Sequence, residues 1–217
     1  MTSEARSASR LVPVALRGPA GELEALLRIR DPDTPAVTAL VCHPHPLHGG
    51  TLHNKVVHRA AATLFDLGAT VLRFNFRGAG KSEGIHDHGV GELEDARAAL
   101  AFLRERYPTA RAWLVGFSFG SWIAARLAAA EPGIERLILI APPVTRSGFE
   151  VLRTLAVPKL IIQGTADEVC PIAELEREST TWAEPKELVR VAGASHFFDR
   201  KLGGLAEALT QRLAGSL

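Results

Sequence analysis

A serine, an aspartate and a histidine stand at places in the sequence that suit nucleophilic catalysis. Ser118 lies in Gly116-Phe117-Ser118-Phe119-Gly120, which has the pattern Gly-x-Ser-x-Gly. A serine hydroxyl is a weak nucleophile unless a base accepts its proton, and that base needs a third group to orient it. Asp167 and His196 complete the chain order serine, acid, histidine. These three residue types together can transfer an acyl group through a covalent intermediate.

The residues around Ser118 predict a sharp turn between a strand and a helix. Residues 113–115 are apolar and suit a short buried strand, whereas residues 121–130 are good helix formers without Gly or Pro. The two glycines of the motif are expected because a side chain would collide across so tight a bend. The turn would expose the Ser118 hydroxyl and aim the backbone N–H of Phe119 at negative charge on a substrate oxygen.

The rest of the chain predicts a hairpin followed by alternating strands and helices. The apolar runs 137–141 and 159–163 are continuous, which is typical of parallel strands covered by helices on both faces. We therefore expect an α/β fold: a three-layer αβα sandwich with a mostly parallel sheet and an N-terminal antiparallel hairpin. Residues 1–10 are expected to be a flexible tail and residues 11–217 a single domain. Further strands are expected at 11–16, 22–29, 36–42, 70–76 and 187–191, and further helices at about 54–67, 91–107, 172–182 and 202–213.

This arrangement would bring the acid and the histidine to Ser118. Asp167 follows the strand at 160–164, and His196 follows the strand at 187–191. In open α/β sheets the ligand crevice lies at the carboxyl ends of the strands, so all three side chains would meet at one edge. Glu168 is a rival for the acid, because it lies in the same loop.

Composition excludes several classes of function. The chain has 217 residues, 47% of them apolar, and a formal net charge of +1, so it has no basic surface typical of nucleic-acid binding. The N-terminal residues lack the apolar core of a signal peptide, and no apolar run is long enough for a membrane span. The two cysteines, Cys42 and Cys170, favour a reducing compartment, although one disulfide is also compatible with them. We expect a cytoplasmic monomer or homodimer without nucleic-acid or membrane partners.

Five histidines near one loop raise the question of a metal site, because neutral imidazoles bind zinc well. The prolines and glycines between them make an irregular loop instead of a regular face of ligands, so we expect no metal. The glycine-rich segment 78–82 lacks the glycine spacing of a phosphate-binding loop and is expected to shape the rim of a pocket. The five histidines are His43, His45, His48, His53 and His58.

Five motifs taken together resemble the α/β-hydrolase fold superfamily, and within it a small bacterial branch of serine hydrolases without a lid domain. They run in the expected order from about residue 10 to the C-terminus. The motifs are Cys42-His43-Pro44-His45-Pro46-Leu47-His48-Gly49-Gly50-Thr51 with Asn54-Lys55-Val56-Val57, Asn75-Phe76-Arg77-Gly78-Ala79-Gly80-Lys81-Ser82, Gly116-Phe117-Ser118-Phe119-Gly120, Gln163-Gly164-Thr165-Ala166-Asp167 and Ser195-His196-Phe197-Phe198.

The resemblance implies an oxyanion hole with one donor at Phe119 and a second in the loop after residue 42. Pro44 and Pro46 have no N–H, which leaves the backbone N–H of His45 as the second donor. Pro44 stands where related hydrolases have glycine. The substrate pocket is expected to be lined by His43, Gly49, Gly50, Phe117 and Arg77.

The expected activity is that of a serine hydrolase, carboxylesterase-like, that uses no cofactor and acts on a small-molecule acyl substrate. Only about 18 residues separate Ile140 from Lys159, which is too few for a lid domain and predicts an open, shallow pocket. Cleavage of a thioester or peptide, or acyl transfer, would use the same three residues. A non-catalytic protein that binds a small ligand in the hydrolase pocket is the alternative from another class.

Overall fold

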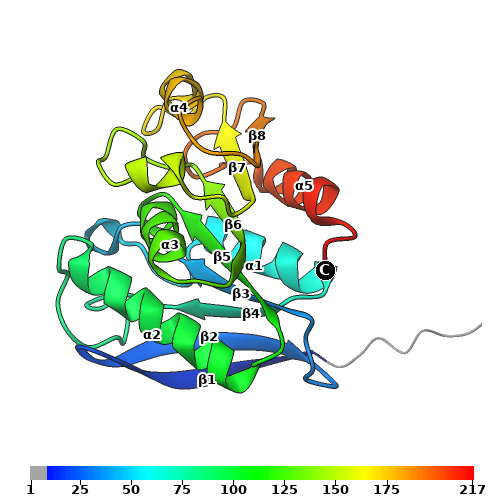
Figure 1. Ribbon diagram of the computed structural model, residues 1–217. Coiled ribbons are helices and arrows are strands. Elements are labelled where there is room, and N and C mark those ends of the chain that lie inside the picture. The colour runs from blue at the N-terminus through cyan, green and yellow to red at the C-terminus, as the bar shows by residue number, and fades with distance from the viewer. Residues whose placement is uncertain (1–8) are drawn as a thin grey trace, which may run out of the picture.

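The structure is a computed structural model that describes residues 9–217 (Figure 1). Residues 1–8 of the predicted tail lie outside the described residues. Ser9 and Arg10 were also expected in the tail, but they belong to the first strand, where they pair with Arg30 and Ile29. The hairpin therefore begins two residues earlier than the apolar pattern indicates.

One eight-stranded sheet forms the centre of the molecule, in the order β1-β2-β4-β3-β5-β6-β7-β8. β1 pairs with β2, and β2 with β4, in antiparallel fashion, whereas the pairs from β4 to β8 are parallel. This confirms the predicted fold class. The strands are β1 (Ser9–Gly18), β2 (Gly21–Arg30), β3 (Val37–Cys42), β4 (Thr70–Phe74), β5 (Arg111–Phe117), β6 (Ile134–Ile140), β7 (Lys159–Gly164) and β8 (Lys186–Val191).

Helices cover both faces of this sheet, as Figure 1 shows. One apolar core packs α2 and α3 against one face, and a second packs α1 and α5 against the other. In β3, Leu40 and Cys42 belong to the first core, whereas Ala39 and Val41 belong to the second, as the alternation of side chains along a strand requires. The helices are α1 (Lys55–Leu67), α2 (Val90–Arg106), α3 (Phe119–Ala130), α4 (Ile172–Ser179) and α5 (Leu202–Leu213), with two 3₁₀ turns, η1 (Pro46–His48) and η2 (Glu150–Arg153).

Two elements end at least two residues earlier than predicted, and local hydrogen bonds accompany both ends. β4 stops at Phe74. The N–H of Asn75 still donates to the Glu24 carbonyl next to the antiparallel pair Ala25–Phe74, but the N–H of Phe76 donates to the His43 ring instead of a strand carbonyl. α4 stops at Ser179, where the hydroxyls of Thr180 and Thr181 donate to carbonyls three residues back. Such side-chain bonds compete with the helical pattern.

The segment between β6 and β7 contains one short 3₁₀ turn, η2, and no lid domain within residues 141–158. This agrees with the prediction from its length. None of the helices in the described part of the chain is long and apolar enough to cross a membrane.

Candidate active site

Ser118 forms the turn that joins β5 to α3, as its motif predicts. Its backbone has φ 53° and ψ −120°, a conformation that costs a residue with a Cβ free energy. A Cβ on Gly116 would lie 2.2 Å from the Gly120 carbonyl oxygen, and one on Gly120 would lie 2.3 Å from the Cys42 carbonyl oxygen. Both glycines of the motif are therefore required by close backbone approach.

The structure brings Ser118, His196 and Asp167 into one chain of hydrogen-bond contacts. His196 Nε2 lies 3.0 Å from Ser118 Oγ, and His196 Nδ1 lies 2.8 Å from Asp167 Oδ2. His196 and Asp167 are only 6% and 5% exposed. Low exposure shields this chain from competing water and strengthens its electrostatics.

The hydrogen bonds around Asp167 determine which ring nitrogen of His196 carries the proton. Its carboxylate accepts backbone N–H groups from Val169 (2.9 Å) and Cys170 (2.8 Å), and the side-chain amide of Gln163 (3.0 Å). Because the carboxylate accepts at Oδ2, His196 carries its proton on Nδ1 and leaves Nε2 free to accept the serine proton. The rival acid Glu168 is exposed and takes no part in these contacts.

The two proposed oxyanion donors lie on elements that adjoin Ser118. Phe119 begins α3, so its N–H is one of the groups that a helix leaves unpaired at its N-terminus. His45 caps η1, and within residues 9–217 neither its N–H nor that of Phe119 has a hydrogen-bond acceptor. Both donors are thus free to bind a substrate oxygen.

A cavity of about 270 Å³ opens beside Ser118. Two of the predicted pocket residues, Gly49 and Gly50, line it. Gly50 lets the backbone fold back, because a Cβ there would lie 2.1 Å from the Pro44 carbonyl oxygen. The cavity is lined by Pro44, His45, His48, Gly49, Gly50, Asn54, Ser118, Val169, His196 and Phe197.

His43 was expected in this pocket, but it is completely buried beneath the loop and does not line the cavity. Its Nδ1 donates to the Pro44 carbonyl at 2.6 Å, and its Nε2 accepts the Phe76 N–H at 3.0 Å. Burial lowers the pKa of His43 to about 4, which keeps the ring neutral with one donor and one acceptor. The residue ties the loop to the end of β4.

Phe117 and Arg77 also lie outside the cavity lining, contrary to expectation. Phe117 points into the core, 1% exposed, with its ring centroid 5.1 Å from that of His196. Arg77 is paired with the fully buried Asp95 through Nε (3.0 Å) and Nη2 (2.7 Å), and these hydrogen bonds raise its pKa. Phe117 thus packs against His196 from the core side, and Arg77 links the segment after β4 to α2. A sequence pattern does not distinguish such positions from ones that line the cavity.

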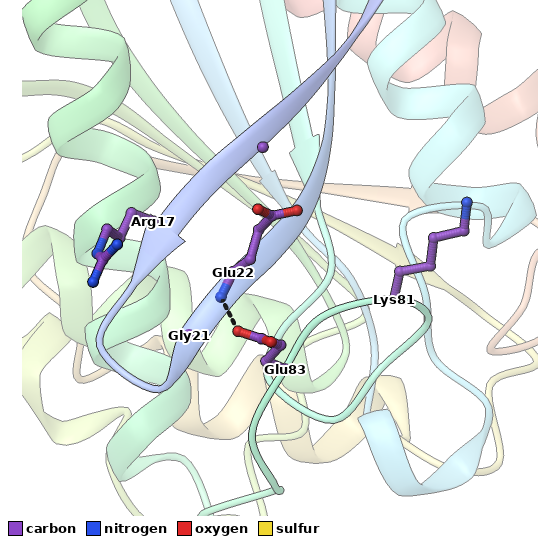
Figure 2. A pocket seen from close by; sticks show the side chains of 6 residues that line it. Arg17, Gly21, Glu22, Lys81 and Glu83 are labelled. Carbon is purple, nitrogen blue, oxygen red and sulfur yellow. Dashed lines mark hydrogen bonds between the residues drawn. The ribbon is translucent and has the colours of Figure 1, made fainter.

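The glycine-rich segment packs on the β1–β2 hairpin and does not shape the cavity rim. Glu83 accepts the backbone N–H of Glu22 at 2.7 Å, as Figure 2 shows, and Ser82 Oγ accepts that of Glu24 at 3.0 Å. A second hollow of about 400 Å³ lies here, and its lining includes Arg17 and Lys81.

The sequence reasoning missed five residues that line the cavity: Pro44, His48, Asn54, Val169 and Phe197. Each one lies in or beside one of the five motifs, so closeness to a motif in the sequence could have indicated that it lines the cavity. Asn54 is a useful example, because its Oδ1 also caps α1 by accepting the Val56 N–H at 2.9 Å.

The described residues contain one group of three potential metal ligands, Asp167, Cys170 and His196, with ligand atoms within 4.8 Å of one another. The loop histidines are not part of it. The oxygens of Asp167 already accept hydrogen bonds from four donors, so the group's carboxylate is engaged by the protein itself. Both cysteines are free and buried, and burial raises the pKa of the Cys170 thiol to about 12.

Comparisons with known proteins place this chain among α/β serine hydrolases. A family model described as serine aminopeptidase, S33, matches residues 44–156. A serine hydrolase without a lid from Xanthomonas campestris has 42% identity and a TM-score of 0.89, covering 96% of this chain and 95% of that one. An α/β serine hydrolase homologue from Coxiella burnetii also has 42% identity, with a TM-score of 0.86 and 99% coverage of both chains. An uncharacterised protein of Rickettsia prowazekii (strain Madrid E) is 37% identical over 92% of this chain and 87% of its own length.

Proposed function

Since the chain belongs to the serine aminopeptidase S33 family of α/β serine hydrolases, we propose that it hydrolyses a carboxylic ester through Ser118. The observation that carries the proposal is the continuous contact from Ser118 Oγ to His196 Nε2 and from His196 Nδ1 to Asp167. A serine at a strained, half-buried turn with an imidazole nitrogen aligned on its hydroxyl is equipped for nucleophilic attack.

In the proposed reaction, Ser118 Oγ attacks the ester carbonyl carbon while its proton passes to His196 Nε2. The carbonyl oxygen takes up the electron pair and is stabilised by the N–H groups of Phe119 and His45. His196 then returns the proton to the departing alcohol, which leaves an acyl group on Ser118. Water repeats the sequence and releases the acid, while Asp167 holds the imidazolium in place.

The cavity supports a compact acyl group. Its volume of about 270 Å³ lies just below the roughly 300–1,000 Å³ of typical small-molecule pockets. Its lining contains apolar surface from Val169 and Phe197 and no carboxylate. An aminopeptidase substrate has an α-ammonium group that needs an acidic partner, so this lining favours an ester over a peptide with a free N-terminus.

Thioester cleavage and acyl transfer would pass through the same acyl-enzyme, so substrate tests must separate them from ester hydrolysis. A protein that only binds a ligand has no need of an activated serine. The intact-protein mass after treatment with a fluorophosphonate tests this directly. We expect one adduct on the wild type, none on Ser118→Ala and slower labelling of His196→Ala. A folded wild type that takes up no adduct would contradict the proposal and favour a binding protein.

A further inference from the structure

A buried carboxylate and a histidine lie behind the oxyanion loop, outside the contacts described above. Glu92, in the first turn of α2, is completely buried, and its carboxylate accepts the backbone N–H groups of Asp87 (2.9 Å) and Gly89 (2.7 Å). Its Oε1 also lies 2.7 Å from Nδ1 of His86, whose side chain is 6% exposed. Burying a carboxylate is costly unless it is paired, so these contacts hold the loop before α2 in a defined shape.

The ring of His86 contacts the side chains of both residues that carry the proposed oxyanion donors. Its centroid lies 4.8 Å from the His45 ring and 5.9 Å from the Phe119 ring, and those two rings are 4.9 Å apart. The three rings therefore form a closed triangle that joins η1, α3 and the loop before α2. The triangle thus connects the His45 loop to the first residue of α3.

We propose that His86, which lies against Glu92, is a positioning residue that sets the separation of the His45 and Phe119 N–H groups. The inference rests on the proposed function, because it concerns the oxyanion hole of that reaction. A hole of this kind works only when its donors are placed for the transition-state oxygen in advance. A misplacement of about 1 Å can reduce the rate about 100-fold.

The alignment of His86 is consistent with a positioning role. Its Nδ1 is buried and lacks a hydrogen bond of suitable angle, although Glu92 Oε1 is within contact distance. A small rotation of the ring would complete this bond, and hydrogen bonds in active sites often tighten only when substrate is bound. Substrate bound against His45 and Phe119 would then press the triangle into its final geometry.

The test compares His86→Ala, His86→Phe and Glu92→Gln with His88→Ala on a 4-nitrophenyl ester. His88 is exposed and contacts only the His86 ring in this group, so it provides a matched control from the same loop. We expect kcat of His86→Ala to fall about 100-fold with KM changed less than about twofold. Phe at position 86 should recover much of the loss by restoring the ring contacts, and Glu92→Gln should lie between the two.

A second substrate separates damage to the oxyanion hole from general loss of structure. A thionoester places sulfur where the oxyanion forms, and sulfur accepts these hydrogen bonds poorly. The ratio of ester to thionoester kcat should therefore be large in the wild type and much smaller in His86→Ala.

An unchanged ratio, or a kcat of His86→Ala within twofold of wild type, would overturn the inference. Failure of the proposed function has a different signature, because the wild type itself would then neither turn over the ester nor take up the fluorophosphonate.

Discussion

Two hollows in this protein differ in size and in how their polar groups are arranged. The hollow at the β1–β2 hairpin is the larger, at about 400 Å³, and charged side chains line it (Figure 2). The cavity beside Ser118 is about 270 Å³, yet its polar groups form a continuous chain from a hydroxyl to a buried carboxylate. The smaller cavity is the better candidate for an active site because its polar groups are hydrogen-bonded to one another, although its volume is smaller.

The topology of the sheet explains this difference. β3, β5, β7 and β8 are parallel, and the loops after their carboxyl ends carry His45, Ser118, Asp167 and His196. Parallel strands deliver such loops to one edge, so side chains from distant parts of the sequence meet there. The hairpin belongs to the antiparallel part of the sheet, where neighbouring strands end at opposite edges and no comparable convergence arises.

The largest expected effect is a difference in activity between variants at the two hollows. Ser118→Ala should reduce ester hydrolysis by on the order of 10⁴–10⁶-fold, because no other group can form the acyl-enzyme. Glu83→Ala, which alters the hairpin hollow, should remain within about twofold of wild type. Steady-state kinetics on both variants, with circular dichroism to verify folding, make the comparison. Comparable losses in the two variants would mean that the hairpin takes part in the reaction.

The second effect concerns the acid of the smaller cavity. Asp167→Asn should reduce kcat by about 10⁴-fold, because an amide favours the wrong tautomer of His196. Glu168→Gln is the matched control, since Glu168 is the exposed neighbour that the sequence could not exclude. Kinetics near neutral pH test the pair, and a larger loss in the Glu168 variant would reassign the acid.

The third effect is on stability, and it should come mainly from His43, which lies beneath the loop beside the Ser118 cavity. Because burial lowers the pKa of His43 to about 4, below the ordinary 6.5, the unfolded state binds the extra proton first as the pH falls. Stability is therefore complete above about pH 6.5 and decreases toward pH 4, by about 3 kcal/mol in total. Between pH 7 and 5 the free energy of unfolding should drop by about 2 kcal/mol.

Urea unfolding at the two pH values measures this difference. The pKa of His45 is lowered in the same direction, by desolvation and nearby cationic groups, so His43→Gln should reduce the pH dependence without removing it. An unaltered pH dependence in His43→Gln would show that the buried ring is not its source.

Much of the fold and the core of the site could be predicted from the sequence, because each depends on local chemistry. The glycines around Ser118 and the continuous apolar strands are dictated by steric limits and burial that act within a few residues. Pairing across the chain could not be predicted in this way. Arg77 looked like a pocket residue because its sequence gives no sign that Asp95 would bind it in the core.

His86 and Glu92 show the same limit more sharply. A glutamate in the first turn of a helix is ordinary, and its spacing to Gly89 indicates only a cap. Its contact with a histidine that touches His45 and Phe119 depends on loops from three separate parts of the chain. Such residues become visible only when the elements are assembled.

At Ser118 the backbone conformation that the proposed activity needs lowers the stability of the fold. Its φ of 53° costs about 1–3 kcal/mol for a residue with a Cβ, whereas glycine adopts it freely at an entropic cost of about 0.5–1 kcal/mol. Ser118→Gly should therefore unfold at a higher temperature than Ser118→Ala, by a difference that calorimetry can measure. Selection for stability alone would replace this serine with glycine, so stability gained at the turn would remove the proposed nucleophile.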